Sequence, residues 1–560
     1  MVEKILNFLH KELNGLHQVA FLLASAAVAS QLLALVRDRL LAARFGAGLE
    51  LDIYYAAFRL PDLVFATLVS LVSVTVLIPF LIEKLKTGHH QSAQAFLNSL
   101  LTVFLFLMVL VSVVLLIVMP TLAPLVAPGF SGAAQKQLVL LSRILLLSPL
   151  LLGLSNLFGA VTQSLGRFFV YALGPVLYNL GIILGICLFE PFWGLAGLTI
   201  GVVLGALAHC LIHLPVMVRN GLLPRLTGRP NFRETNAVFS VSVPRSLALA
   251  SNQLALLVLV ALASFLGAGS IAVLNFALNL QSVPLVIVGV SYSVAAFPAL
   301  AKLFAAGDKT EFMKQIAVAI RHILFWSLLA TVLFIVLRAQ IVRVILGAGR
   351  FDWQDTRLTA AALALFILSV AGQGLIQLFI RGYYACGKTR RPLLLNALAA
   401  AVIIGLGFIL SKLFVWSTLL KHLIEAVLRV TNINGTAVLM LPLAYSLGVM
   451  INLFLFWFFF QKDFGPFPKI VDRSLVQSFF ASLIAGLVSY QLLNILDNLF
   501  NINTFLGIFA QGLFAGLSGI VIFFLVLKWW RNKEVAELQR SLWVRFWKIK
   551  PALVPEKEEL

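Results

Sequence analysis

The sequence predicts an all-α polytopic membrane protein with about 14 transmembrane helices, on the basis of its composition, its long apolar runs and an internal repeat. Of its 560 residues, 61% are hydrophobic and only 11% are charged. Soluble domains carry roughly 25% charged residues. So few charges cannot cover a surface in water, whereas helices that face lipid need very few.

Runs of about 20 mainly apolar residues, the length that a helix needs to cross a bilayer, recur along the whole chain. We expect spans at 18–44, 53–82, 92–119, 135–163, 168–189, 193–218, 237–265, 270–301, 312–337, 358–385, 392–415, 437–460, 474–496 and 504–528. Helices are favoured because the runs are about twice the length of a barrel strand and do not alternate.

Two stretches between these runs receive a different interpretation. The proline-rich region 120–134 is expected to be a loop. The stretch 415–436 mixes apolar residues with Lys421, Glu425 and Arg429, which is typical of an amphipathic piece at the membrane interface.

The basic residues predict the orientation. With both termini cytoplasmic, most of the 42 lysines and arginines fall on the cytoplasmic side, which fits the positive-inside rule. The net charge of +20 is then explained by topology and by attraction to anionic lipid. No basic groove with interleaved aromatic residues indicates a nucleic-acid partner.

Three pairs of short motifs recur at the same offset of 221 residues. Gly46-Ala47-Gly48 returns as Gly267-Ala268-Gly269, Ala127 and Phe130 return as Ala348 and Phe351, and Gly166 returns as Gly387. Six crossings restore the starting side, so the repeat predicts two parallel six-helix lobes, an architecture of transporters.

The expected organisation follows from that repeat. It has a cytoplasmic N-terminal segment 1–16, an N-lobe 17–220, a cytoplasmic inter-lobe loop 221–236, a C-lobe 237–465, helices 13 and 14 in 466–530, and a cytoplasmic basic and aromatic tail 531–560.

Charged residues at membrane depth are the first functional candidates, because each costs several kcal/mol unless it is paired or hydrated. The first span carries Arg37, Asp38 and Arg39, and the second begins with Asp52 and Arg59. Arg37 and Asp38 are sequence neighbours about 100° apart on a helix, so we do not expect a simple facing pair. The pattern fits either a charged, hydrated cavity or helix-end pairing, for example of Arg37 with Asp52.

The second half of the chain carries polar stripes at helical spacing. They are Arg245 with Asn252, then Asn275 with Asn279 and Ser282, and then Gln373 with Gln377 and Arg381. Such stripes either line a cavity or join helices by hydrogen bonds. Arg245 is the stronger candidate for a binding site, because no carboxylate lies near it in sequence. Pro175 and Asn179 favour a kink or a packing role.

The sequence gives little support for metal, redox or catalytic chemistry. His209 and His213 are spaced as two metal ligands could be, but no carboxylate lies near them, so we expect no metal site. Cys187, Cys210 and Cys386 form no CxxC motif. No nucleophile with a base, no paired catalytic carboxylates and no cofactor motif stands out.

Taken together, motifs along nearly the whole chain resemble those of the MurJ (MviN) family, lipid II flippases of the multidrug/oligosaccharidyl-lipid/polysaccharide exporter superfamily. The motifs are Arg37-Asp38, Phe45-Gly46-Ala47-Gly48, Asp52, Ala57-Phe58-Arg59-Leu60-Pro61, Ile78-Pro79, Ala127-Pro128-Gly129-Phe130, Gly166-Arg167-Phe168, Pro244, Ala296-Phe297-Pro298, Phe351-Asp352 and 381–392.

The resemblance implies a transporter of the bacterial inner (cytoplasmic) membrane and not an enzyme, with no cofactor. Its substrate would be lipid II, the undecaprenyl-pyrophosphate-linked disaccharide-pentapeptide, moved from the inner to the outer leaflet by alternating access. Arg37 would face the pyrophosphate, Asp38 and Asp52 would be its essential partners, and helices 13 and 14 would form a groove for the lipid tail. Membrane lipid and cell-wall synthesis proteins are the other implied partners.

The chain departs from the family pattern at four positions. Gln31, Phe65 and Asn279 stand where the family usually has basic residues, and Ser70 stands near a usual glutamate. The resemblance thus implies a cavity with fewer cations.

Two consequences of the missing cations are open. Either nearby arginines compensate or the lipid-linked substrate differs. The candidate binding residues are Arg37, Asp38, Asp52, Arg59, Arg245, Asn252 and Asn279, with Arg39 as a further compensating cation.

Three alternative functions are compatible with the residues. Two are transporters: a flippase for another polyprenyl-linked oligosaccharide, and a drug or cation antiporter of the same superfamily. The third is a polyprenyl-phosphate-dependent membrane glycosyltransferase, which would use Glu50 or Asp52 as an acid in an outward-facing loop.

Overall fold

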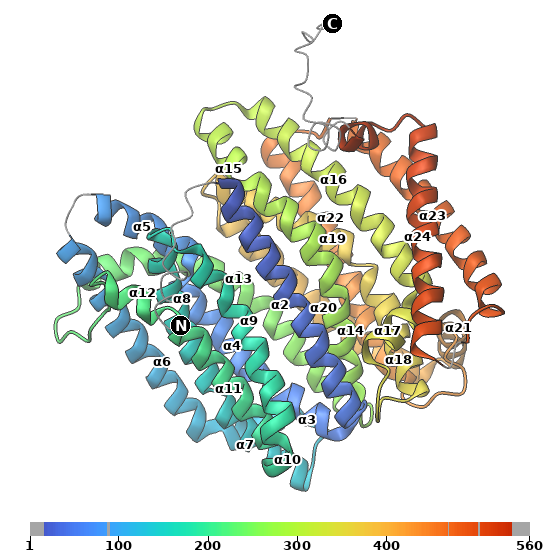
Figure 1. The fold of residues 1–560 in the computed structure, drawn as a ribbon, viewed down its shortest axis with the longest axis horizontal. Helices are drawn as coiled ribbons and strands as arrows, with labels where there is room; N and C mark the ends of the chain where they lie inside the picture. Colours follow the sequence, from blue (N-terminus) through green and yellow to red (C-terminus); the bar gives the residue numbers. More distant parts are fainter. Residues whose placement is uncertain (1–15, 87–89, 469, 502–503, 540–560) are drawn as a thin grey trace, which may run out of the picture. The chain divides into compact units, whose positions relative to one another are not determined.

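The computed structural model describes residues 16–86, 90–468, 470–501 and 504–539, and in these ranges every regular element is a helix (Figure 1). Eleven helices are long and apolar enough to cross a membrane, or up to 13 if each of two bent pairs is one span. This confirms the predicted all-α membrane fold with a slightly lower count than about fourteen. The helix over the first predicted span, α2 (Leu16–Phe45), is not among the eleven, and it carries four charges in its last nine residues.

The chain forms two compact units, each of which is described by itself. Unit 1 comprises residues 1–280, 345–366 and 388–452. Its helices are α2, α3 (Leu49–Ala57), α4 (Arg59–Thr67), η1 (Val69–Val72), α5 (Val74–Lys86), α6 (His90–Val126), α7 (Gly132–Leu145), α8 (Leu147–Ser164), α9 (Phe168–Leu184), η2 (Gly185–Phe189), α10 (Glu190–Trp193), α11 (Leu195–Leu211), α12 (Leu214–Arg219), α13 (Phe232–Ala263), α20 (Arg390–Trp416), α21 (Thr418–Leu428) and η4 (Thr436–Leu439). It also holds most of α14 (Ser270–Pro284) and α18 (Trp353–Ile367) and half of α22 (Met440–Phe464).

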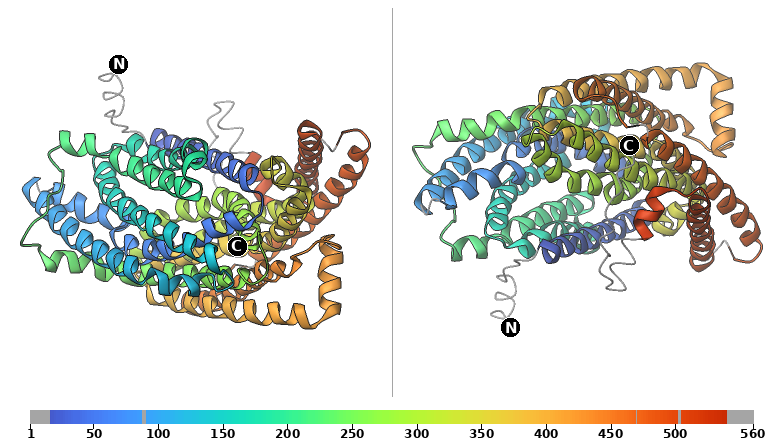
Figure 2. Two further views of the ribbon diagram at one scale, coloured as in Figure 1. Left: turned by 90° about the horizontal axis from the view of Figure 1, so that it is seen from below. Right: turned by 90° about the horizontal axis from the view of Figure 1, so that it is seen from above.

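Unit 2 comprises residues 281–344, 367–387 and 453–560. Its elements are η3 (Leu285–Val290), α15 (Ser291–Ala305), α16 (Lys309–Val336), most of α17 (Arg338–Leu346), α19 (Val370–Ala385), the end of α22, α23 (Ile470–Asp497) and α24 (Phe505–Trp529). The last two helices pack along each other and against α16, around buried Phe325, Leu329 and Phe523 (Figure 2).

Small residues allow helices of unit 1 to approach closely. A side chain at Gly181 would lie 2.2 Å from the Cα of Gly205, and one at Gly201 would lie 2.3 Å from the Cα of Gly185. These glycines lie where α9 and the η2 segment that follows it pack against α11, so the backbones are in contact there. Membrane helices associate in this way because lipid gives them no hydrophobic drive to pack.

The second predicted span is broken where a continuous helix was expected. The chain interrupts its helix at Phe58 and again between Leu68 and Ser73, and the pair Leu49–Thr67 and Val69–Leu85 is bent by 42°. Carbonyl groups near the break accept hydrogen bonds from nearby side chains. Thr67 Oγ1 donates to the carbonyl of Leu63 at 2.8 Å, and Ser70 Oγ donates to the carbonyl of Ala66. Irregular backbone is tolerated at membrane depth when it is buried in protein.

The prediction of a loop over 120–134 is wrong for its first half. Helix α6 runs through Pro120 and Pro124 to Val126, and α7 begins at Gly132. Membrane helices tolerate proline when neighbours stabilise the turn. Here Met119 and Ala123 are buried against such neighbours.

The stretch predicted as interfacial forms a separate helix. α21 turns sharply away from the axis of α20 (Figure 2). Its N-terminus is capped by Ser417, and its buried Glu425 accepts a hydrogen bond from Thr436 at 2.6 Å. Leu419, Leu423 and Val427 are exposed, which fits an amphipathic helix.

The repeated motifs form matching turns. The amide of Phe130 donates to the carbonyl of Ala127 at 3.1 Å, and that of Phe351 donates to Ala348 at 3.1 Å. Gly166 and Gly387, with φ of 73° and 69°, each end a helix in the left-handed conformation that favours glycine. The division into two parallel lobes stays a prediction, as do the two predicted terminal segments, of which residues 1–15 and 540–560 lie outside the described residues.

Candidate functional site

The polar residues of α2 form a network inside unit 1. Arg37 and Asp38 make an ion pair, in which Nε and Nη2 of Arg37 donate to Asp38 Oδ1 at 3.0 and 2.8 Å. The expectation that these neighbours cannot pair is therefore wrong. The angle between their Cα–Cβ directions matters less than the length of the arginine, whose side chain reaches across the helix surface to the neighbouring carboxylate.

Helix α9 supplies the next partner. Arg37 Nη1 donates to Asn179 Oδ1 at 3.1 Å, and Asn179 Nδ2 donates to Ser30 Oγ, also at 3.1 Å. The amide thus joins two residues of α2 that are seven positions apart and share one face. The same Nδ2 lies 3.2 Å from the carbonyl of Pro175, one turn earlier in α9. Asn179 therefore orients the arginine in addition to its predicted packing role.

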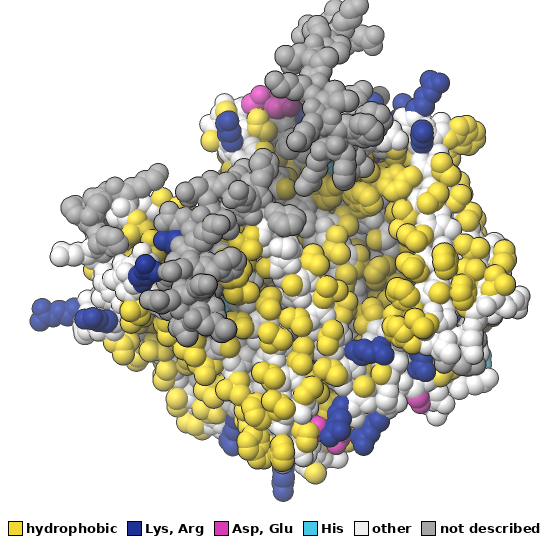
Figure 3. All heavy atoms as spheres, in the orientation of Figure 1, with side chains coloured by type: hydrophobic (Ala, Val, Ile, Leu, Met, Phe, Trp, Pro, Cys, Tyr) yellow, Lys and Arg dark blue, Asp and Glu magenta, His cyan; other side chains and the backbone are white. Residues whose placement is uncertain are grey.

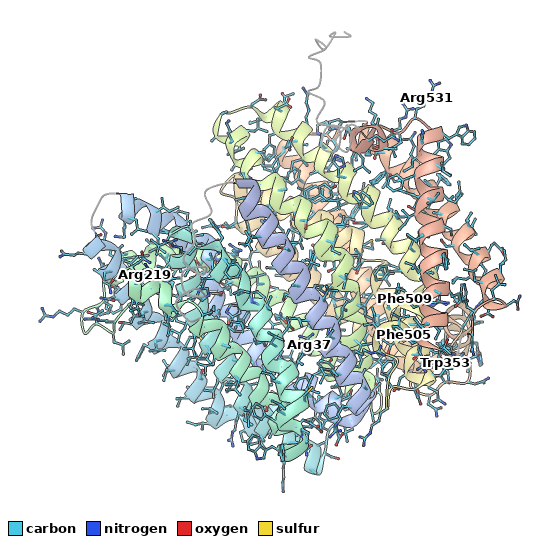
Figure 4. All side chains as sticks on the ribbon, in the orientation of Figure 1. Arg37, Arg219, Trp353, Phe505, Phe509 and Arg531 are labelled. Carbon is cyan, nitrogen blue, oxygen red and sulfur yellow. The ribbon has the colours of Figure 1, made fainter. Side chains whose placement is uncertain are left out.

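Helix α14 closes the network from the other side. Asn279 Nδ2 donates to Asp38 Oδ2 at 3.0 Å, so each carboxylate oxygen of Asp38 has its own donor. The Asp38 side chain is 3% exposed, whereas that of Arg37 is 20% exposed. Asp38 is thus enclosed, and Arg37, labelled in Figure 4, retains an accessible edge. A guanidinium held in this way can present parallel N–H groups to a phosphate oxygen pair.

Arg59 occupies a different, closed environment. Its side chain is buried, Nη2 donates to Asn275 Oδ1 at 2.5 Å, and Nε lies 3.4 Å from the carbonyl of Tyr55. Arg59 therefore connects α4 to α14.

Asp52 is bonded to the backbone at the start of α14. Its Oδ2 accepts from the amide of Gly269 at 2.6 Å, and its Oδ1 accepts from that of Ala272 at 2.7 Å. A buried carboxylate is stabilised at a helix N-terminus by the free amides and by the helix dipole. The alternative of pairing with Arg37 is therefore replaced by a capping role, which sequence neighbours could not indicate.

A second carboxylate, that of Asp355, bonds to the other copy of the repeated glycine turn, at Gly46-Ala47-Gly48. Asp355 Oδ2 accepts from the amide of Ala47 at 3.1 Å, and the amide of Arg350 donates to the carbonyl of Ala43 at 2.9 Å. The turn at Gly269 lies so close to Ala47 that a Cβ there would be 2.0 Å from the Ala47 carbonyl oxygen. The two turns and their carboxylates thus form one packed cluster in unit 1.

The remaining predicted residues lie on α13 and at the end of α2. Arg245 is half-buried and Asn252 is exposed. Ser246, next to Arg245, accepts a hydrogen bond at its Oγ from Ser70 Oγ at 2.6 Å, so the region where the resemblance implies a glutamate carries a buried hydroxyl pair. Arg39 Nη1 lies 3.3 Å from the carbonyl of Ile345. Phe65 is 38% exposed.

The two histidines of α11 and its extension are structural. His209 Nδ1 bonds to Ser155 Oγ at 2.6 Å, and His213 Nδ1 bonds to Thr162 Oγ1 at 3.1 Å. Among the described residues, no group of three or more His, Cys, Asp or Glu side chains could hold a metal ion.

Sequence reasoning missed three residues of this arrangement, namely Asp355 altogether and Asn179 and Asn275 as partners of arginines. The sequence feature that could have identified them is an amide or carboxylate side chain in a largely apolar helix. Such a residue indicates that a polar partner exists but does not identify that partner.

The architecture matches known transporters. A solved structure named "Lipid II flippase MurJ, inward closed conformation" superposes with a TM-score of 0.72 and 20% identity, and the match covers 91% of this chain and 99% of that one. A structure named as an inward-facing MATE family transporter of the MOP superfamily has a TM-score of 0.63 and 14% identity, over 78% and 94% of the two chains. At these identities the likeness establishes the fold.

The family is decided by sequence. Residues 41–511 match the family described as "Lipid II flippase MurJ". The chain belongs to the MurJ family. "Probable lipid II flippase MurJ" from Thermotoga maritima is 29% identical over 68% of this chain and 76% of its own length. The protein of that name from Buchnera aphidicola is 27% identical over 65% and 72%.

Membership in the MurJ family has two direct consequences. The chain is a multi-pass membrane transporter of the flippase type, as the resemblance implied. The glycosyltransferase alternative is excluded, and one of the two carboxylates that it would have used, Asp52, accepts hydrogen bonds from two backbone amides instead.

Proposed function

We propose that this protein carries lipid II, undecaprenyl-pyrophosphate linked to a disaccharide-pentapeptide, from the inner to the outer leaflet of the bacterial cytoplasmic membrane for peptidoglycan synthesis. Both termini would be cytoplasmic, the two predicted lobes would alternate access, and α23 with α24 would accommodate the lipid tail. Cell-wall synthesis proteins are the proposed protein partners.

One observation carries the proposal: the accessible guanidinium of Arg37 is oriented by Asp38 and Asn179 within apolar helices. A pyrophosphate has oxygens in pairs, and a planar guanidinium matches such pairs with parallel hydrogen bonds. The low dielectric of the surroundings strengthens this attraction compared with water. A polyprenyl tail stays in lipid while the charged head group needs such a partner inside the protein.

Asp38 has a distinct part in the proposed cycle. Its ion pair keeps Arg37 neutralised when no substrate is present, because an unpaired charge at membrane depth is costly. When a pyrophosphate takes the Arg37 donors, Asp38 keeps the hydrogen bond from Asn279. The arginine can therefore exchange partners while the carboxylate keeps one hydrogen bond.

The test is complementation of a bacterial strain depleted of its own lipid II flippase. Wild type should restore growth, and Arg37→Ala should not, because two charge-assisted hydrogen bonds of roughly 1.5–3 kcal/mol each would be lost. Arg44→Ala is the matched control: Arg44 lies on the same helix, and its side chain is 53% exposed and paired with Glu190. Equal rescue by Arg37→Ala and Arg44→Ala at matched membrane levels would contradict the proposed role.

A second candidate function rests on the departures from the family pattern. Gln31, Phe65 and Asn279 place neutral groups where the family usually has cations. A flippase for another polyprenyl-linked oligosaccharide would need fewer of them. If the wild type is inserted and folded yet fails to rescue, this substrate class takes first place, and a strain lacking an oligosaccharide flippase becomes the host to test.

A further inference from the structure

A polar face at the start of α6 is not used by the proposed transport cycle. Most of α6 is apolar, but Ser92, Asn98, Ser99 and Thr102 recur at helical spacing on its first turns. They meet the segment 220–231 that joins α12 to α13, and both parts belong to unit 1.

The polar face holds the backbone of this segment at several points. Amides of the segment donate to α6 side chains: Arg225 to Asn98 Oδ1 at 2.6 Å, Thr227 to Thr102 Oγ1 at 3.0 Å and Asn231 to Ser99 Oγ at 3.0 Å. In return, Gln94 Nε2 donates to the carbonyl of Leu223 at 2.6 Å. The segment is therefore an ordered wall beside α6.

A cavity of about 240 Å³ lies between this wall and α6. Its polar lining includes Ser92, Asn98 and Arg229. One carboxylate, that of Glu234, also lines it, and this group bonds to Lys84 Nζ at 3.0 Å. The local acid is thus balanced by its own lysine.

The cations around the cavity are available. Within the described part of the chain, the guanidinium groups of Arg225, Arg229 and Arg233 make no ion pair or hydrogen bond, and all three residues are exposed. Arg219, labelled in Figure 4, adds a fourth exposed arginine just before the segment. Figure 3 shows dark-blue side chains gathered at this end of unit 1, where the helices α5 and α12 lie in Figure 1.

Apolar groups next to these arginines distinguish a lipid from a free anion. Leu226 is 66% exposed and Phe232 is 67% exposed, directly between the arginines in sequence. Only 17% of the most apolar window of α6 is buried, and Phe106 on this stretch is 66% exposed. A lipid whose head group entered the cavity could therefore lay its acyl chains along α6.

The geometry points to a binding site for the phosphodiester head group of an anionic phospholipid, formed by Arg229, Asn98 and Ser92 and flanked by Leu226 and Phe232. Basic residues near a membrane surface attract anionic lipid, and serine and asparagine groups add hydrogen bonds to phosphate oxygens. The site is separate from Arg37 and does not depend on the proposed substrate.

The test measures lipid binding to the full-length protein in neutral detergent by native mass spectrometry, with phosphatidylglycerol and phosphatidylcholine as probes. Wild type should prefer phosphatidylglycerol, and Arg229→Gln should weaken its binding about fivefold, the effect of one basic residue at a membrane surface. Asn98→Asp keeps the acceptor for the Arg225 amide but adds a negative charge, so it should also weaken binding. Unchanged melting temperatures would show that both variants are folded.

Arg390→Gln is the matched control, since Arg390 is an exposed arginine of the same unit and the first residue of α20. An equal loss in Arg390→Gln, or none in Arg229→Gln and Asn98→Asp, would overturn the site in favour of general surface attraction. Inorganic phosphate is the second arm. If it displaces phosphatidylglycerol and binds delipidated protein as tightly, the cavity takes a free anion and the lipid assignment is wrong.

Discussion

Replacing Asp52 by alanine removes the two shortest backbone contacts described at the start of α14. The carboxylate accepts from the amides of Gly269 at 2.6 Å and Ala272 at 2.7 Å, and it is only 1% exposed. Alanine leaves both amides buried without an acceptor, because no other described side chain reaches them. The repeated glycine turn beside Ala47 then loses its anchor.

The size of the effect follows from these contacts. Hydrogen bonds to charged groups contribute roughly 1.5–3 kcal/mol each, and a carboxylate at a helix N-terminus adds up to about 2 kcal/mol in partly buried geometry. Burial of the carboxylate offsets part of this sum. We expect Asp52→Ala to lose about 3 kcal/mol of stability. Asp52→Asn keeps one oxygen acceptor without charge and should lose about half as much.

Thermal unfolding of purified protein in one detergent is the assay, with Glu50→Ala as the matched control. Glu50 lies two residues earlier in the first turn of α3, but it is exposed. Its removal should change stability by less than about 0.5 kcal/mol, as is usual for surface positions. Equal melting temperatures for Asp52→Ala and Glu50→Ala would refute the capping role and reopen a direct role in substrate binding.

Four further outcomes are expected. Gly269→Ala should destabilise the protein more than Gly267→Ala in the same unfolding assay. Both glycines have positive φ, which costs an alanine roughly 1–2 kcal/mol, but only the Cβ added at 269 would meet a backbone oxygen, that of Ala47, at 2.0 Å. In unit 2, Glu534→Gln should cost about 3–5 kcal/mol by breaking a buried ion pair with a 2.5 Å contact, whereas exposed Glu537→Gln should cost under about 1 kcal/mol. Burial raises the pKa of Glu534, but hydrogen bonds from its arginine and serine partners outweigh burial and hold this pKa below the ordinary 4.5. The contribution of Glu534 to stability is therefore full above pH 4.5 and is lost on acidification. Melting curves at several pH values will show this loss. Asn279→Lys should support growth at least as well as wild type in the depleted strain, and failure at normal expression would contradict the charge argument below.

Sequence alone predicted the membrane fold because the thickness of the bilayer determines the length of the apolar runs. It failed where local rules depend on neighbours. Pro120 and Pro124 looked like helix breakers, but buried packing at Met119 and Ala123 lets α6 continue. The break at Phe58 has a cause in the sequence that the prediction of a continuous span did not use: Pro61 has no N–H to donate to the carbonyl of Ala57, where α3 ends.

For the site, sequence identified the costly residues but not their partners. Arg37 stood out because a charge in an apolar run demands an explanation. One hydrogen-bond donor to Asp52, the amide of Gly269, lies 217 positions away in sequence, and the side-chain amide that accepts from Arg37, that of Asn179, lies 142 positions away. Helix packing determines such pairs, and the periodicity of the sequence does not predict how the helices pack. The pairing of Arg37 with Asp38 was missed because a rule about Cβ directions does not describe a long, flexible side chain.

The charge of the network bears on how this protein handles an anion. Arg37 and Asp38 cancel each other, and Asn279 supplies a hydrogen bond to Asp38 but no charge. A pyrophosphate that approaches Arg37 therefore meets a neutral cluster and must separate an ion pair in a medium of low dielectric, where charge separation is costly. A lysine at 279, a position where the resemblance implies a basic residue, would neutralise Asp38 by itself and release the full charge of Arg37. We infer that this chain binds its substrate head group more weakly in the ground state than the Asn279→Lys variant would.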